Sequence, residues 1–199
     1  NNDLTITSGT LKCNNDNTLT VNGDVSILGT LGSPTWTATM YLGGDMSGSG
    51  TYEHGNQEVV FDGTCTIDGN FDFYDLTEGS TGGYLVLQDG TITTVEHELT
   101  ISTRVLLRAA SVTTTLVLGT GTSSGTIINN GIFDPLRDSG SGTSVIQLAS
   151  SNYFADLTGD GVYNWDFGAA THTGEIRWAW LNHKGTDASA KTTGGDGVT

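Results

Sequence analysis

The sequence is poor in basic residues and in long apolar runs. It contains seven Lys or Arg residues against 22 Asp or Glu residues, which gives a formal net charge of −15. Nucleic acid is therefore not expected as a partner, because binding it requires a cationic surface. No apolar run approaches the ~20 residues that cross a bilayer, so no membrane span is expected.

Helical periodicity and catalytic motifs are also missing. The nearest approach to a helix, residues 95–110, alternates like a strand at Leu99 and Ile101 and is rich in Thr and Ser. The four histidines lack the HxH or HExxH spacing of a zinc site, and no G-x-S-x-G nucleophile elbow occurs. The sequence therefore predicts neither an enzyme nor a zinc centre.

Short alternating strands punctuated by glycine fill the chain instead. Runs such as TLTV, EVVF, YLVL, TLVL and EIRW are separated by Gly, Asn, Asp or Ser. Apolar residues make up 35% of the chain, and their regular arrangement argues against disorder. The chain is predicted to be all-β.

Three of these strands share the pattern apolar-x-apolar-x-Gly-x-apolar, and the three copies begin at Leu19, Met40 and Val59. One strand pattern in each period of about 20 to 30 residues is typical of a solenoid, in which equivalent residues stack on successive coils. Two inward stacks are expected from this alignment, namely Val25 with Met46 and Cys65, and Val21 with Leu42 and Phe61.

The second half of the chain repeats with a longer period. Comparable runs end at Leu87, Leu118, Leu148 and Trp178. FYDLTEG (73–79) also matches FADLTGD (154–160). We expect a β-solenoid of about seven coils over residues 1–183 without significant helix. The Gly- and Thr-rich segment 184–199 would be ordered by a neighbouring subunit or begin another coil.

The segment DLTGDG (156–161) resembles the start of a calcium-binding loop. Asp156, Thr158 and Asp160 occupy ligand positions 1, 3 and 5, and a glycine follows at position 6. Position 12 holds Phe167 instead of an acid, and the earlier copy of the FxDLT unit has no such continuation. A solenoid corner is therefore favoured over a Ca²⁺ site, and the three residues stay candidate metal ligands.

Two further groups of carboxylates are candidates for chemistry. Asp24 and Asp45 fall at equivalent places on neighbouring coils, where stacked charges need either solvent or a bridging Ca²⁺ ion. Asp72, Asp75 and Glu78 lie close together in sequence, and a glycosidase requires such paired acids, but no nearby Arg or Lys accompanies them. Solvated carboxylates are expected in both groups.

The tryptophans near the C-terminus are Trp165, Trp178 and Trp180. These tryptophans are expected to close the end of the core or to contact another subunit. Stacking on sugar rings is the alternative role.

Cys13 and Cys65 are predicted to stay unpaired thiols. They should lie about three coils apart, roughly 14 Å at the strand spacing, whereas a disulfide needs Cα atoms within ~7 Å.

The stretch GSGTYEHGNQEVVFDG (48–63) followed by FYDLTEG resembles a loose family of repetitive, secreted β-solenoid proteins. Such proteins occur on bacterial and archaeal surfaces and in phage fibres. The resemblance implies a right-handed parallel β-helix and an extracellular, cell-surface or virion-surface location. It carries no catalytic residues across.

These observations favour a non-catalytic building block of an extracellular filament, surface layer or fibre, which joins copies of itself head to tail through open solenoid ends. The alternatives are a glycan-binding or glycan-cleaving β-helix, such as a tailspike or polysaccharide lyase, and a β-sandwich adhesin or pilin-like subunit. No cofactor is expected, and Ca²⁺ is the only ion that stays a candidate for binding. The start at Asn1, without an initiator Met, fits a processed exported protein or a fragment.

Overall fold

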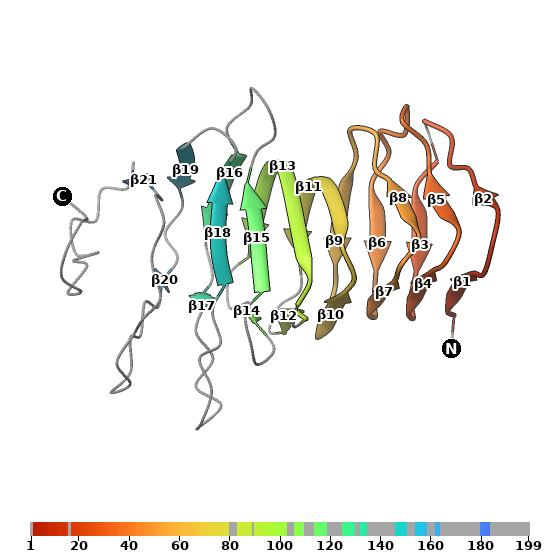
Figure 1. The fold of residues 1–199 in the computed structure, drawn as a ribbon, viewed down its shortest axis with the longest axis horizontal. Coiled ribbons are helices and arrows are strands. Elements are labelled where there is room, and N and C mark those ends of the chain that lie inside the picture. The colour runs from red at the N-terminus through yellow and green to blue at the C-terminus, as the bar shows by residue number, and fades with distance from the viewer. Residues whose placement is uncertain are drawn as a thin grey trace.

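The computed structural model describes residues 2–102 apart from Asp16, 80–82 and Asp89, and beyond Ser102 it describes the backbone of strands β14 to β21 (Figure 1). Past Ser102, the burial of side chains is described for Leu116, Val117 and Ile128 alone. Every regular element in these described parts is a β-strand, as predicted. They accordingly contain no helix of the length and apolarity that crossing a membrane requires.

The strands form three sheets in which every pairing is parallel. Sheet A consists, in spatial order, of β1 (Leu4–Ile6), β4 (Val25–Ile27), β7 (Met46–Gly48), β10 (Cys65–Asp68), β12 (Tyr84–Leu87), β14 (Leu106–Ala109), β17 (Ile132–Asp134) and β20 (Val162–Tyr163). Sheet B consists of β2 (Thr10–Leu11), β5 (Thr30–Gly32) and β8 (Thr51–Glu53).

Sheet C runs the length of the molecule beside sheet A (Figure 1). Its main path consists of β3 (Leu19–Val21), β6 (Met40–Leu42), β9 (Glu58–Phe61), β11 (Phe71–Glu78), β13 (Ile92–Ile101), β16 (Gly125–Asn129), β19 (Phe154–Thr158) and β21 (Trp180–His183). Two more strands extend it beside β13, namely β15 (Thr114–Leu118) and β18 (Ile146–Ser150). The predicted parallel β-solenoid is confirmed.

The cross-section of the solenoid changes along its axis. Each of the first three coils contributes one strand to each sheet, in the order A, B, C. After β10 the chain passes directly into β11, an eight-residue strand, and later into β13, a strand of ten residues. These long strands take the place of the separate B and C strands, so each of the later coils in residues 2–102 alternates between sheets A and C.

The number of turns differs slightly from the prediction. About five turns are described in full, whereas about seven coils were expected, although the ladder of sheet A continues to β20. Coil length is not constant, which is why counting with a fixed period misleads. In sheet A, the stacked residues Leu4, Val25, Met46 and Ile67 are evenly spaced in sequence. In sheet C the chain takes a longer path from Leu99 to Ile127 than from Leu76 to Leu99.

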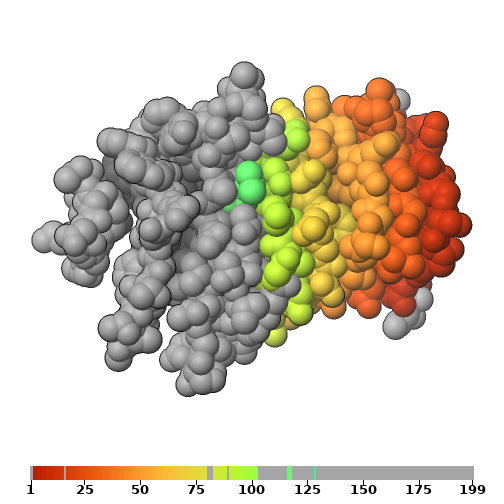
Figure 2. Space-filling model, in the orientation of Figure 1, coloured from red at the N-terminus to blue at the C-terminus, as the bar shows by residue number. Residues whose placement is uncertain are grey.

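Inward side chains stack into one continuous apolar core. Val21, Leu42 and Phe61 lie opposite one another on β3, β6 and β9 and are all buried, as predicted. In the space-filling view the described coils adjoin as successive colour bands from red to green (Figure 2). Their backbones lie about 4.8 Å apart, so each inward side chain packs on its counterparts in neighbouring coils.

The second predicted stack is correct for Val25 and Met46 but wrong in register for Cys65. Cys65 is buried, yet Met46 lies opposite Ile67, and Cys65 lies opposite Leu85. The corner between sheets C and A explains the difference. In this coil the chain needs two more residues than in the preceding coil to pass from its strand in sheet C to the residue that pairs in sheet A.

The predicted series of Leu87, Leu118, Leu148 and Trp178 is wrong. Leu87 lies in sheet A opposite Ala109, whereas Leu118 lies in β15 of sheet C opposite Val95 and Ser150. Trp178 lies outside the described residues. Apolar runs of similar composition occur in both sheets, so the pattern alone did not reveal which sheet each run enters.

The long-range repeat of the FxDLT unit, by contrast, is confirmed. Asp75 on β11 lies opposite Glu98 on β13, which lies opposite Thr126 on β16, which in turn lies opposite Asp156 on β19. Asp75 and Asp156 therefore occupy the same line of positions across sheet C.

Candidate functional site

The corner that precedes sheet A carries a ladder of three aspartates, Asp3, Asp24 and Asp45, called here the aspartate ladder. Oδ1 of Asp3 accepts a hydrogen bond of 3.0 Å from the backbone N–H of Asp24. Oδ1 of Asp24 accepts one of 2.9 Å from Asp45, and Oδ1 of Asp45 accepts one of 2.7 Å from Thr66. Each carboxylate thus binds the next coil, and the predicted equivalence of Asp24 and Asp45 is confirmed.

The glycine before Asp45 makes room for this contact. A Cβ atom on Gly44 would lie 2.3 Å from Oδ1 of Asp24 and 2.7 Å from the backbone of Gly23. No side chain fits there, which is why the Gly-Asp pair recurs at 23–24 and 44–45. Each of the stacked carboxylates accepts a hydrogen bond from a backbone N–H group. Within the described residues, moreover, no group of three or more His, Cys, Asp or Glu side chains is placed to hold a metal ion.

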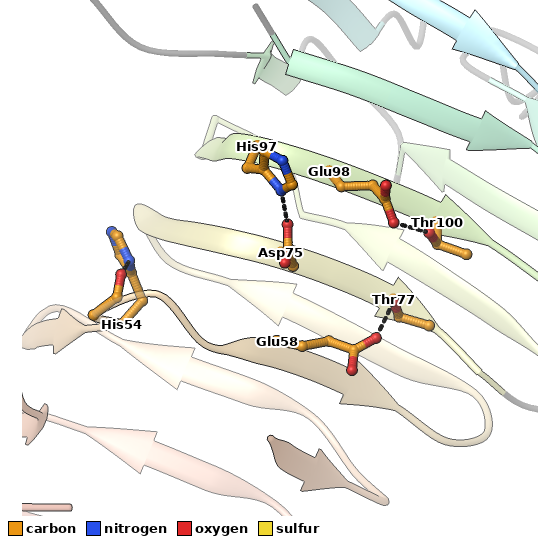
Figure 3. Close-up of polar contacts among 8 residues, drawn as sticks. His54, Glu58, Asp75, Thr77, His97, Glu98 and Thr100 are labelled. Carbon is orange, nitrogen blue, oxygen red and sulfur yellow. Dashed lines mark hydrogen bonds and ion pairs between the residues drawn. The ribbon is translucent and has the colours of Figure 1, made fainter. Parts of the chain in front are cut away.

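The outer face of sheet C carries a second line of acids, called here the acid row. Glu58, Asp75 and Glu98 lie in register on β9, β11 and β13 (Figure 3). Thr77 Oγ1 donates a hydrogen bond of 2.7 Å to Glu58, and Thr100 Oγ1 donates one of 3.1 Å to Glu98. Like charges on neighbouring strands destabilise a sheet, and these donors offset part of that cost.

A β-bulge in β13 supplies the partner of the middle acid. Relative to β11, β13 has one extra residue here, so that Glu96 and His97 together lie opposite Tyr74. The bulge brings the imidazole of His97 over the ring of Tyr74, with ring centroids 4.9 Å apart and planes 12° from parallel. Nδ1 of His97 lies 2.7 Å from Oδ1 of Asp75 (Figure 3). The arrangement places an exposed imidazole at hydrogen-bond distance from a carboxylate.

A second histidine lies near the same bulge. Nε2 of His54 is 3.6 Å from Oε1 of Glu96, and its Nδ1 is at hydrogen-bond distance from the backbone oxygen of Gly55. The two histidines are therefore each paired with a carboxylate on the outer surface. Sequence reasoning missed both pairs, because the two partners in each pair come from different coils and are far apart in the sequence. The EHE run at 96–98 was the one local signal.

The predicted cluster of Asp72, Asp75 and Glu78 is divided between the two faces of β11. Asp72 is exposed and Asp75 is half-buried in the acid row, whereas Glu78 points into the core and is 1% exposed. The expectation of a solvated surface carboxylate is therefore wrong for Glu78. Burial raises the pKa of Glu78 to about 8, because the ionised form loses its hydration.

The predicted metal ligands are only partly described. Asp156 and Thr158 belong to strand β19, where Asp156 lies opposite Thr126 and Thr158 lies opposite Ile128. Asp160 lies outside the described residues, so the calcium site stays a prediction. Trp165 and Trp178 also lie outside, and Trp180 begins β21.

Cys13 and Cys65 are free thiols, as predicted. Cys65 is buried and Cys13 is half-buried, and burial raises the pKa of both. A raised pKa keeps a thiol protonated and unreactive at neutral pH, so neither residue resembles a catalytic nucleophile.

Comparisons with protein-family models, with curated proteins and with solved structures find no match for this chain. Its function has to be inferred from the solenoid and from the two groups of surface acids.

Proposed function

We propose that the chain is a non-catalytic building block of an extracellular filament, surface layer or fibre, and that copies join head to tail through their solenoid ends. The observation that carries this proposal is the edge of the first coil. In the part of the chain that the structure describes, β1, β2 and β3 are each the terminal strand of their sheet. Edge strands offer backbone N–H and C=O groups to another strand.

The alternation of the backbone identifies these groups. The N–H of Leu4 donates a hydrogen bond of 2.8 Å to Asp24 O, and Ile6 O accepts one of 2.8 Å from Leu28 N–H. Both residues therefore face the second coil, and Thr5 between them faces the open side. In β3, Val21 O accepts from the N–H of Gly43, so Thr20 faces the open side in the same way.

The opposite ends of the two long sheets are β20 in sheet A and β21 in sheet C. A partner that pairs such a strand with β1 or β3 makes a heterologous contact, which does not close and so produces a filament. The net charge of −15 would keep neighbouring filaments apart. Abundant Thr and Gly with few Lys residues also suit an external location.

Proline in the edge strands tests the proposal. Thr5→Pro combined with Thr20→Pro removes two donors on the open side and leaves the bonds to the second coil intact. The double variant is expected to keep the circular dichroism spectrum of the parent and to form no filaments in electron micrographs. The matched control, Thr5→Val with Thr20→Val, keeps both N–H groups and should assemble normally.

Filaments of parental length from the folded proline variant would rule out assembly through this edge. Residues 184–199 lie outside the described residues, and deleting 185–199 asks separately whether the tail is the connector. If the shortened protein assembles like the parent, the tail has no part in the contact.

A second candidate function is glycan binding, which the bulge on sheet C favours. Tyr74, His97 and Asp75 place an aromatic pair beside a carboxylate on the outer surface, and aromatic rings commonly stack on sugars. Retention of the parent on an immobilised polysaccharide, lost in both Asp75→Asn and His97→Ala, would support this function. Turnover of a polysaccharide that disappears in Asp75→Asn would overturn the non-catalytic proposal.

A further inference from the structure

Glu78 is an ionisable side chain enclosed by the apolar core. It lies at the end of β11 opposite Phe61 on β9 and Ile101 on β13, and both of these neighbours are fully buried. Glu78 itself is 1% exposed, and among the described residues neither of its carboxyl oxygens has a hydrogen-bond partner. A buried carboxyl group without partners is tolerated in the neutral form far better than as an anion.

The titratable groups around this part of the core would not stabilise an anion. Burial is the main cause that raises the pKa of the Cys65 thiol on β10, and Glu78 is close enough for its charge to add to this effect. Asp62 after β9, together with Asp24 and Asp45 at the neighbouring corner, acts on the same thiol in the same direction. Lys12 is the only Lys or Arg in the sequence from 2 to 102. Among the described side chains of residues 2–102, the charge in this region is therefore negative.

The backbone holds Glu78 in this position from both sides. The N–H of Gly79 donates a hydrogen bond of 2.9 Å to Phe61 O, and the N–H of Ser102 donates one of 3.1 Å to Glu78 O. Packing is tight, because a Cβ atom on Gly79 would lie 2.7 Å from Cγ1 of Val60. An ionised carboxylate can therefore become hydrated only if this end of the core opens.

We propose that Glu78 is a proton-controlled switch in the solenoid core: the neutral acid keeps the β9–β11–β13 side closed, and the ionised form admits water and uncovers Cys65. The switch depends on the packing of this side and is independent of end-to-end assembly. It would allow the solenoid to respond to an alkaline environment by local opening.

Cys65 provides a built-in reporter for this opening. In a Cys13→Ser background it is the only thiol in the chain. The alkylation rate of Cys65 is measured on the folded protein at about pH 6 and about pH 9. At each pH this rate is divided by the rate of the same thiol in urea, because the ratio corrects for thiol ionisation. The relative rate is expected to rise by about tenfold or more with Glu78 present. Glu78→Gln should abolish the rise.

Glu58→Gln is the matched control, because Glu58 lies on the neighbouring strand but points outward. It should leave the pH-dependent rise intact. A relative rate that does not change with pH in the parent, or an equal rise in Glu78→Gln, would overturn the proposal. Glu78→Met serves if the glutamine variant does not fold. Carboxyl ¹³C NMR of the parent gives a second measurement, and a Glu78 signal that titrates near the ordinary value would also overturn it.

Discussion

Oδ1 of Asp24 lies 2.9 Å from the backbone nitrogen of Asp45, one coil further along the solenoid. The contact joins two aspartates that would otherwise repel each other, because the N–H of one residue binds the carboxylate of the other. The same geometry recurs from Asp3 to Asp24 and from Asp45 to Thr66. A line of acidic residues at a solenoid corner can therefore stabilise the stack without a cation.

Substitutions of Asp24 separate the hydrogen bond from the charge. Asp24→Ala removes the acceptor and is expected to lower the free energy of unfolding by about 1 kcal/mol. Asp24→Asn keeps an oxygen acceptor and relieves repulsion, so its stability should stay within about 0.5 kcal/mol of the parent. Urea unfolding in EGTA and in millimolar CaCl₂ measures both values. If Asn is as harmful as Ala and the parent alone is stabilised by Ca²⁺, a bridging cation holds the corner instead.

The inward positions of the first coils could be predicted because their alternation is regular. Val21, Leu42 and Phe61 occupy the same place in three copies of one strand pattern, and the structure stacks them. Cys65 follows the same pattern and is buried, but Ile67 takes its place opposite Met46. A corner that is longer by two residues preserves which side chains point inward, since strand alternation has a period of two, and changes only the register.

The candidate sites could not be predicted to the same extent. Asp24 and Asp45 share one local motif, so their equivalence was visible in the sequence. The pairing of His97 with Asp75 depends on a bulge, and nothing in the EHE run shows that two residues of β13 lie opposite one residue of β11. The inward orientation of Glu78 was missed because a carboxylate is expected to face solvent.

The register of Met46 predicts which core pair is energetically coupled. Met46→Ala and Ile67→Ala should each cost about 2–5 kcal/mol of unfolding free energy, because each leaves a cavity in a buried stack. A double-mutant cycle on this pair should show a coupling of at least about 0.5 kcal/mol. The cycle of Met46→Ala with Cys65→Ala is the control and should show weaker coupling. Stronger coupling to Cys65 would contradict the observed register.

Calcium should have little effect on stability. Asp156 belongs to strand β19 at a position equivalent to Asp75 on β11. The FxDLT unit therefore forms a strand in both places, although a calcium-like sequence follows only the copy that contains Asp156. Millimolar CaCl₂ is expected to raise the Tm of the parent by less than about 2 °C, a shift typical of weak binding. Differential scanning calorimetry of the parent and of Asp160→Ala measures the effect. A large increase that Asp160→Ala abolishes would establish Asp156, Thr158 and Asp160 as ligands.

Stability should fall between mildly acidic and mildly alkaline pH because of Glu78. Its pKa is about 8 in the folded chain against an ordinary value of 4.5, so between these values the folded chain keeps a proton that the unfolded chain releases. The favourable contribution is fully present below about pH 4.5 and is lost as the pH rises to about 8, with a total change of about 3–5 kcal/mol.

Glu78→Gln cannot ionise, so its urea unfolding free energy should exceed that of the parent most strongly above about pH 8. The difference between the two proteins should shrink steadily on acidification and reach its minimum below about pH 4.5. Taking the difference cancels the effect of the other carboxylates, which titrate in both proteins. Glu58→Gln, an outward acid on the adjacent strand, should show no comparable growth of its difference from the parent between about pH 6 and about pH 9. Parallel curves for the parent and Glu78→Gln would show that Glu78 ionises normally and that water already reaches it.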